Sequence, residues 1–151
     1  MSTYRHKVII GDKEYAMSKL APFTANTFIL KLSKIIVPVL GAVKGKDVME
    51  MDIKEAVSVL SDTLDQSTIT NLIFPMFKAS QVASLTDNAK IEDEKSFNAV
   101  FTTDNLADFY ALIWEVLQYN FANFIGGLGS RFGFQLGDLK EATQTLQKLE
   151  S

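Results

Sequence analysis

The sequence of 151 residues contains no cysteine, and it has only one histidine and one tryptophan. Without cysteine, the chain can form no disulfide, no thiolate zinc site, no iron–sulfur cluster and no thiol nucleophile. With His6 as the only imidazole, one chain can build neither a Ser-His-Asp triad nor a multi-histidine metal site. The carboxylates fall at predicted helix caps, on polar helix faces and in a polar loop. We therefore expect a protein that is not an enzyme and that binds no metal or cofactor.

Long apolar runs and an excess of positive charge are also missing. The longest uninterrupted apolar run, residues 35–43, includes Pro38 and Gly41 and falls far short of the roughly 18 residues that span a bilayer. Residues 1–7 carry charge without a following apolar stretch, so we predict no secretory signal. The net charge of −3 supplies no basic field for a phosphate backbone. We expect neither a membrane nor a nucleic acid as a partner.

The charge is divided unevenly along the chain. Residues 1–50 contain eight lysines and arginines against four acids, whereas residues 51–151 contain seven against fourteen. Two interpretations remain open. The two halves neutralise one another within the fold, or they support head-to-tail self-association or docking on a charged partner.

The composition is that of a folded domain with an ordinary surface. Hydrophobic residues make up 47% of the chain and charged residues 22%, which is too apolar for a disordered protein. The length fits one domain. The periodicity predicts a mainly α, α+β fold, in which a helical bundle carries a small N-terminal β-hairpin or small sheet.

Residues 7–17 hold two short β-prone runs around a Gly-Asp-Lys turn, which predicts a β-hairpin. A hairpin alone is only marginally stable, so it must pack on helices or join other strands. Between residues 80 and 94 the apolar period fades into polar residues, with β-prone pieces near Val82 and Ile91. We interpret this stretch as a loop or a small hairpin that could pair with the N-terminal strands.

An amphipathic helix is predicted to begin at Pro22. Pro38 should kink it near residues 34–37, and the glycines that follow should end it before Lys46. Its apolar positions are Ala25, Phe28, Leu32, Ile35, Ile36 and Val39, and its polar face carries Thr24, Thr27, Lys31 and Lys34.

Two shorter helices are predicted next. The first begins after Asp52, which serves as its N-cap, with Glu55 three residues later to complete a capping box. The second covers about residues 69–77, where Pro75 lies inside the apolar pattern and must kink or divide the helix.

The longest predicted helix covers residues 104–125, with Asp104 as its N-cap. It is apolar around most of its circumference, which is unusual for a helix at the surface of a protein. Two interpretations remain open. The helix lies at the centre of its own bundle, or part of its surface is covered by another copy or by a partner.

Glycines follow this helix in residues 126–133. The stretch lacks the spacing and the lysine of a Walker-type phosphate loop, so we interpret it as a helix end and a flexible joint. We divide the chain into a helical domain with its β-hairpin (residues 1–125), a glycine-rich joint (126–137) and a C-terminal amphipathic segment (138–151). The last segment either folds back on the body, frays or orders on a partner. Its apolar positions are Leu139, Ala142, Leu146 and Leu149.

Three stretches of the chain together point to a known family. They are the N-terminal hairpin, the leucine- and isoleucine-rich helix after it, and an aromatic stretch that leads into the long apolar helix. The clearest pieces are residues 8–15 (VIIGDKEY), 97–101 (FNAVF) and 112–124 (LIWEVLQYNFANF). In order and spacing, through most of residues 7–133, they resemble the tail assembly chaperones of long-tailed bacteriophages and related prophages.

The resemblance implies a small, mainly helical, non-enzymatic protein that binds the tape-measure protein and keeps it soluble while tail-tube subunits assemble around it. It also implies action in the cytoplasm of the bacterial host, absence from the mature virion, and the tail-tube protein as a second candidate partner. Exposed apolar surface that accepts helices would serve this function. We further expect a homo-oligomer that forms through the apolar helices.

Two other classes of protein remain open from the residues alone. One is a small helical inhibitor or regulator, encoded by a phage or prophage, that binds a folded host protein. The other is a carrier that encloses an apolar ligand. We predict that aromatic residues and leucines of the last segments anchor a helical partner, with core packing as the alternative role of each. These residues are Trp114, Tyr119, Phe124, Phe132, Leu139 and Leu146.

Overall fold

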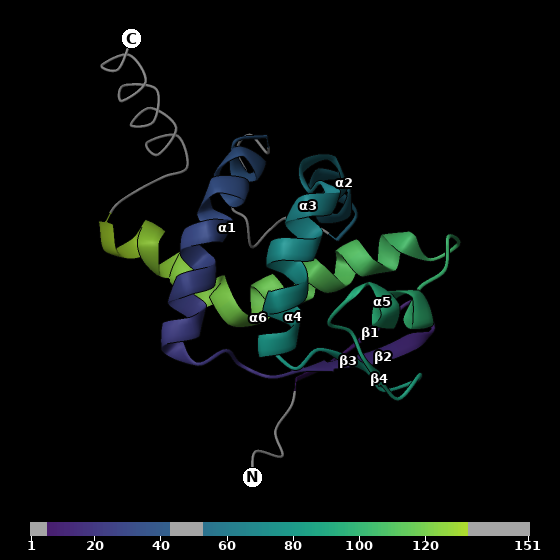
Figure 1. Ribbon diagram of the computed structural model, residues 1–151. Helices are drawn as coiled ribbons and strands as arrows, with labels where there is room; N and C mark the ends of the chain where they lie inside the picture. Colours follow the sequence, from purple (N-terminus) through teal and green to yellow (C-terminus); the bar gives the residue numbers. More distant parts are fainter. Residues whose placement is uncertain (1–5, 43–52, 133–151) are drawn as a thin grey trace.

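The computed structural model describes residues 6–42 and 53–132 and confirms a mainly helical α+β protein. Figure 1 shows α6 crossing the molecule, with α1, α2 and α4 on one side of it and the sheet at the lower edge. The elements in chain order are β1 (His6–Ile10), β2 (Lys13–Met17), α1 (Pro22–Ala42), α2 (Ile53–Thr63), α3 (Gln66–Thr68), the π-helical turn η2 (Ile69–Ile73), α4 (Phe74–Ala79), β3 (Ala83–Ser84), β4 (Ala89–Lys90), α5 (Glu94–Val100) and α6 (Leu106–Phe132).

The predicted hairpin is confirmed as β1 and β2, which pair antiparallel with Val8 opposite Tyr15. Gly11 has a φ of +60° at the first of the two turn positions, which is the arrangement of a type II′ turn. The sheet order is β1-β2-β3-β4, so β2 lies inside the sheet and β1 at its edge. The pairing of the stretch after residue 80 with the N-terminal strands is thereby confirmed, with Tyr15 opposite Ser84.

The two helices predicted after the hairpin are confirmed. Helix α1 begins at Pro22 and continues through Pro38 to Ala42, which agrees with an end before Lys46. A proline removes one backbone donor from a helix but does not always end it. Helix α2 begins at Ile53, and the predicted cap before it lies outside the described residues.

The predicted third helix is longer than its apolar pattern indicated. It begins at Gln66, because the Asp65 carboxylate accepts a hydrogen bond of 2.7 Å from the Thr68 N–H. Pro75 neither ends nor separates the helical run. The π-helical turn η2 precedes it, in which the Phe74 N–H bonds to the Ile69 carbonyl five residues back, and α4 continues directly from there. The wider turn accommodates a residue that has no N–H to donate.

Helix α5 was not expected, because the sequence between residues 92 and 101 is short and strongly polar at its start. A capping box begins it. The Asp93 carboxylate accepts from the Ser96 N–H at 2.8 Å, and the Ser96 hydroxyl accepts from the Asp93 N–H at 3.0 Å. Serine at the third helical position, where glutamate or glutamine is usual, made this signal hard to find in the sequence.

Both predicted ends of the long helix are corrected by the structure. Helix α6 begins at Leu106, so Asn105 and not Asp104 immediately precedes it. The Asp104 N–H instead bonds to the Thr102 hydroxyl at 3.2 Å, within the preceding turn. The helix also continues through the glycines to Phe132, so it does not end at residue 126. The division into a body, a joint and a C-terminal segment stays a prediction, because residues 133–151 lie outside the described part of the chain.

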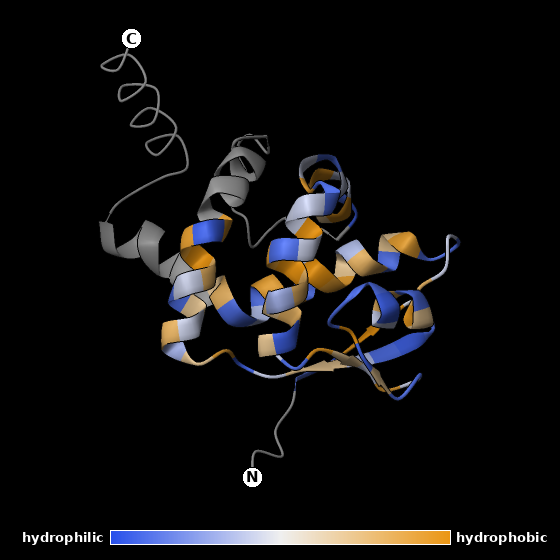
Figure 2. Cartoon of the chain, viewed as in Figure 1, coloured by the Kyte–Doolittle hydropathy of each residue, from blue (hydrophilic) through white to orange (hydrophobic). Residues whose placement is uncertain are grey.

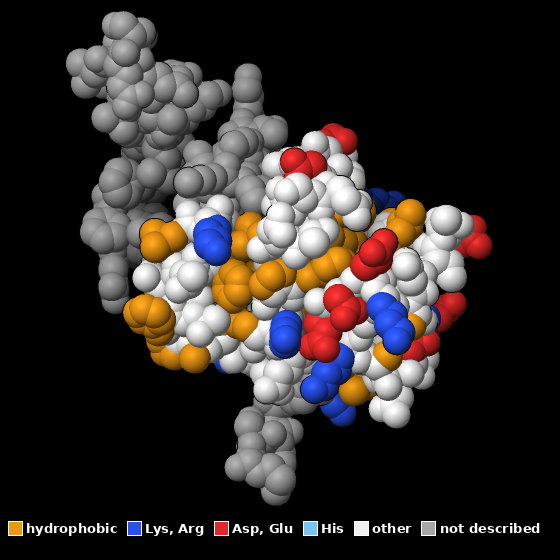
Figure 3. Space-filling model, in the orientation of Figure 1, with side chains coloured by type: hydrophobic (Ala, Val, Ile, Leu, Met, Phe, Trp, Pro, Cys, Tyr) orange, Lys and Arg blue, Asp and Glu red, His pale blue; other side chains and the backbone are white. Residues whose placement is uncertain are grey.

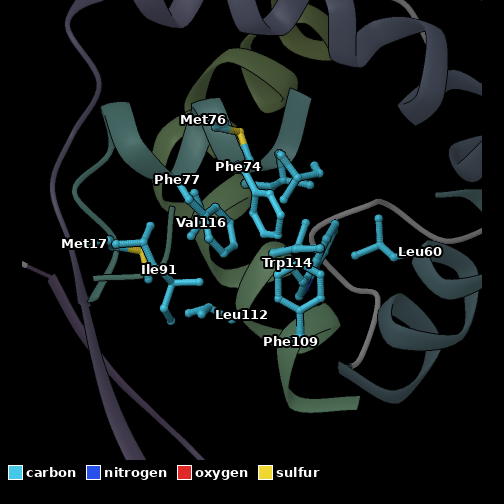
Figure 4. Close-up of a cluster of buried hydrophobic side chains, with 14 of the residues drawn as sticks. Met17, Leu60, Phe74, Met76, Phe77, Ile91, Phe109, Leu112, Trp114 and Val116 are labelled. Atoms are coloured by element: carbon cyan, nitrogen blue, oxygen red, sulfur yellow. The ribbon is translucent and has the colours of Figure 1, made fainter. Parts of the chain in front are cut away.

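The core is built on α6. Phe109 of this helix lies at the centre of an aromatic cluster, with ring centroids 4.7 Å from Phe97 and 5.9 Å from Phe77. Figure 4 shows Phe109 and Trp114 beside Phe74 of α4. Figure 2 shows hydrophobic residues concentrated where α1, α4 and α6 meet. Of the two interpretations of the apolar α6, the described part of the helix supports the first: it lies at the centre of its own bundle.

Replacement of Gly11 by alanine should destabilise the protein by about 1–3 kcal/mol, because the residue has a positive φ and the added Cβ would lie 2.8 Å from the Asp108 carboxylate. Urea unfolding would measure the change. The same substitution in an Asp108→Ala background should cost less, since only the backbone strain remains. An equal cost in both backgrounds would show that the Asp108 contact is not part of the penalty.

Candidate functional site

The outward face of α1 carries two large apolar side chains in contact with solvent. Phe23 is 84% exposed and Leu30 is 63% exposed. They are seven residues apart, which places them on one face of the helix about 10.5 Å apart along its axis. Asn26 and Thr27 lie between them on the same face and are also exposed. We call these four residues the α1 stripe.

The α1 stripe faces solvent because the opposite face of the helix packs in the core. Phe28, Ile29 and Leu32 are buried, and Ala25 packs partly against them. These positions confirm the apolar face that the sequence predicts for this helix. A helix that buries one face normally presents polar residues on the other, so exposed phenylalanine and leucine there are the informative exception.

Charge is distributed unevenly around this surface. Helix α1 contains Lys31 and Lys34 and no acidic residue. Lys31 is exposed at the flank of the α1 stripe. Figure 3 shows hydrophobic side chains gathered at the outer edge of α1 and between α1 and α4, whereas charged side chains of both signs lie over the sheet and α5. The α1 side of the molecule therefore presents an apolar surface with the cationic Lys31 at its flank.

The chain just before α1 is tied to the middle of α6. The Leu20 N–H donates to the Asn120 side-chain oxygen at 2.9 Å. The Lys19 ammonium lies 4.1 Å from the centre of the Tyr119 ring and also donates to the Tyr119 carbonyl. The Asn120 amide in turn donates to the Ser80 hydroxyl at 3.3 Å. These contacts place the start of α1, and with it the α1 stripe, at a defined position along α6.

The N-terminal strand also contacts Tyr119, through His6. The His6 ring stacks on Tyr119 with centroids 4.5 Å apart and an angle of 10° between the rings. Nearby, partial burial raises the pKa of the Glu115 carboxyl, and the coulombic effect of His6 opposes that shift. The single histidine of the sequence thus has a packing role in this cluster.

Among the described residues, no three side chains of His, Cys, Asp or Glu gather in a group that could hold a metal ion. Within the same residues, no helix is both long enough and apolar enough to cross a membrane. An ion pair joins Lys13 and Asp87 at 2.8 Å, and the Lys13 ammonium also donates to the Val100 carbonyl. The hydrogen bond from Lys13 lowers the pKa of the Asp87 carboxyl and joins the hairpin to the β3–β4 turn.

Comparison with known proteins decides the family. Residues 11–131 match the family model described as phage tail assembly chaperone protein. The chain belongs to the phage tail assembly chaperone family. No curated protein and no solved structure matched it. The resemblance seen in the sequence is therefore confirmed, and the matched residues run from the hairpin turn through nearly all of α6.

The six predicted anchor residues of the chaperone differ in burial and in how much of each the structure describes. Trp114 is only 7% exposed and lies in the core, which is the alternative role that was open for it. Tyr119 is half-buried, and its ring contacts His6 and Lys19. Phe124 and Phe132 lie in α6, but the structure describes only the backbone there. Leu139 and Leu146 lie outside the described residues.

The sequence did contain a signal for the two residues that were missed. Phe23 and Leu30 interrupt a helix face that otherwise carries Thr27 and Lys31. Two apolar residues exactly one heptad apart on a polar face are a recognisable pattern. They were overlooked because the inward face of the same helix is more strongly apolar and accounts for the periodicity alone.

Trp114→Ala should lower the free energy of unfolding of the chaperone by about 3–5 kcal/mol, because the indole fills space in the core that alanine leaves empty. Leu106→Ala, at an exposed position of the same helix, should cost well under that amount. Thermal or urea unfolding of the two variants would measure the difference. A Trp114 variant as stable as the Leu106 variant would return Trp114 to the candidate partner contacts.

Tyr15 is fully buried in the sheet, and its hydroxyl has no hydrogen-bond partner. Burial, reinforced by Asp108 and Asp87, raises the pKa of this phenol to about 12. Between pH 10 and pH 12, the unfolded chain therefore loses the Tyr15 proton before the folded chain does. The stabilisation that this shift provides is complete below pH 10 and is lost as the pH rises toward 12.

Tyr15→Phe should be close to neutral for stability at pH 8, since it removes a hydroxyl that makes no hydrogen bond. Between pH 8 and pH 11, the parent protein should lose about 1 kcal/mol more unfolding free energy than the variant. Urea unfolding of both proteins at the two pH values gives the comparison. Parallel losses in the two proteins would mean that the Tyr15 phenol does not titrate abnormally.

Proposed function

We propose that this protein binds helical, apolar segments of the tape-measure protein and keeps that protein soluble during assembly of the tail tube. The observation that carries the proposal is the α1 stripe: Phe23 and Leu30 are exposed one heptad apart on a member of the tail assembly chaperone family. A partner helix that offers apolar residues at the same spacing can pack against such a face. Such apolar contacts can shield the apolar segments of the tape-measure protein, which we call the client, without recognising its polar residues one by one.

The remaining parts of the proposal follow from the same function. The protein acts in the cytoplasm of the bacterial host, is not an enzyme, and is absent from the mature virion. It self-associates through apolar helix surface, and the tail-tube protein is its second candidate partner. Support comes from the family and from the surface of α1, where exposed apolar side chains leave contact area for another helix.

The proposed contact surface combines described and undescribed residues. The α1 stripe forms its described part, and Tyr119 borders the base of α1 through Lys19. The aromatic and leucine residues toward the C-terminus extend it as proposed anchors. These residues are Phe124, Phe132, Leu139 and Leu146. Trp114 is not one of these proposed anchors, because its side chain is buried in the core.

The test is expression of the tape-measure protein that is encoded nearby, with and without this chain, followed by co-purification on a tag. The chain should raise the soluble fraction of the tape-measure protein and elute with it. Unchanged solubility together with tight binding of a folded host protein would overturn the proposal in favour of the inhibitor alternative.

Phe23→Asp combined with Leu30→Asp should reduce the co-purified tape-measure protein at least tenfold, because a charged carboxylate in an apolar contact costs more than the 1.4 kcal/mol that a factor of ten represents. Ser58→Asp combined with Ser61→Asp places the same two charges on the exposed face of α2 and serves as the matched control. Both variants should keep the parent melting temperature within a few degrees. Equal capture by the two variants would show that the α1 stripe is not the client-binding surface.

A further inference from the structure

We propose that β1 pairs antiparallel with β1 of a second copy of this chain, so that the four-stranded sheets of two copies join into one. This contact uses the free edge of the sheet. It is separate from the α1 stripe and from self-association through apolar helix surface. It can be measured without any tail protein, so its failure and the failure of the client-binding proposal are distinguishable.

One side of β1 has no partner strand in the described sheet. This edge strand has five residues, whereas β4 at the opposite edge has two. The Glu14 carbonyl accepts from the Leu85 N–H at 2.8 Å, so Glu14 directs its backbone groups toward β3. Ile9, opposite Glu14, then directs its own groups away from β2, as does Lys7 two residues before it. Among the described residues, no hydrogen bond reaches the backbone of Ile9 or Lys7, which leaves a template for another strand.

The side chains at this edge are exposed as well. Ile9 is 75% exposed, and Lys7 is also exposed. Both lie on the outer face of the sheet, because Val8 between them packs partly against the core. Helix α6 packs on the inner face, where His6 stacks on Tyr119. A large aliphatic side chain on an unpaired edge is apolar surface that a second strand would cover.

One register satisfies this edge in both copies. With a two-fold axis at Val8, Lys7 of each copy lies opposite Ile9 of the other. Opposite residues of this kind exchange both of their backbone hydrogen bonds, which gives about four bonds across the axis. A register centred on Lys7 would instead place two lysines opposite each other, which is unfavourable. A register centred on Ile9 would place Lys7 opposite Gly11, which belongs to the turn.

Charge complementarity favours a second copy as the occupant of the edge. On the outer face, Ile9 would have Lys7 of the second copy on one side and its own partner Glu14 on the other. Lys7 and Glu14 of different copies are then about 9–10 Å apart between backbones, a gap that their two long side chains can close. The lysine stem would cover Ile9 while its ammonium reaches the carboxylate. In the described part of the chain, neither Lys7 nor Glu14 has an ion-pair partner.

Such pairing removes an exposed strand edge and brings two chaperone bodies together. An occupied edge can no longer take up extended segments of other chains. Both copies of α6 would lie on one face of the joined sheet, and each copy would keep its own α1 stripe. A client with more than one apolar segment can then contact two stripes at once. This last consequence rests on the proposed function, whereas the pairing itself does not.

Disulfide capture in the full chain tests the pairing. Because the chain has no cysteine, Val8→Cys places one thiol on the proposed axis, where the two Cα atoms would be about 4.5 Å apart and within disulfide range. Lys7→Cys is the matched control: it is more exposed, but its two copies would lie about 7–8 Å apart, beyond that range. Under mild oxidation, Val8→Cys should form covalent dimer at least tenfold faster. Equal rates, or faster capture of Lys7→Cys, would overturn the proposal.

Charge exchange tests the register without a thiol. Lys7→Glu alone and Glu14→Lys alone each place like charges across the axis, so each should raise the dimer dissociation constant at least tenfold at low ionic strength. An equimolar mixture of the two variants restores opposite charges in a heterodimer and should recover the parent dissociation constant within about threefold. Sedimentation equilibrium measures all three samples. A mixture that associates no better than the single variants would overturn the proposal.

Two further comparisons separate this contact from other associations. The melting temperatures of Lys7→Glu and Glu14→Lys should stay within a few degrees of the parent, since neither side chain is buried. Phe23→Asp combined with Leu30→Asp should leave the dimer intact, because it alters only the α1 stripe. Loss of the dimer in that variant, together with an intact dimer in Lys7→Glu, would overturn the proposal and assign self-association to α1. A chain that stays monomeric and pairs its edge with a client would also overturn it.

Discussion

Burial of α6 is the interaction on which the rest of this structure depends. Its aromatic and aliphatic side chains contact α2, α4, α5 and the sheet, so every described layer packs against one helix. Phe109 alone has ring contacts with phenylalanines from α4, α5 and the turn after α5. A helix that is apolar on nearly all sides must be surrounded in this way, because leaving any of its faces in water would forfeit the hydrophobic stabilisation of the fold.

The position of the candidate contact surface follows from that central helix. Polar side chains at the border of the core, above all Asn120, join α6 to the chain before α1 and to the end of α4. These hydrogen bonds have direction as well as energy, so they determine where α1 begins. The inward face of α1 then fills the remaining space over the core. Phe23 and Leu30 are exposed because this placement leaves them on the outward face of α1.

Much of the fold could be predicted, because local patterns agree with it. The hairpin turn, the start of α1 at a proline and the apolar face of α2 each reflect a preference of the backbone over a few residues. The errors also have local causes. Asn105 and Asp104 are both reasonable caps, and the choice between them depends on the turn that approaches α6. Glycines in the last turns of α6 did not end it, since a glycine lowers helix stability by only about 1 kcal/mol.

The predicted anchor residues show most clearly what the sequence decides and what the tertiary structure decides. The sequence by itself determined the kind of protein: a small helical chain without thiols, with a hairpin at one end and one almost wholly apolar helix, in the order typical of tail assembly chaperones. Aromatic content could not say which rings face outward, so Trp114 was as good a candidate as Phe23. Only the tertiary structure decided that Trp114 is enclosed and Phe23 is exposed. The physical reason is that exposure depends on what packs from distant parts of the chain, whereas periodicity reports only which residues share a face.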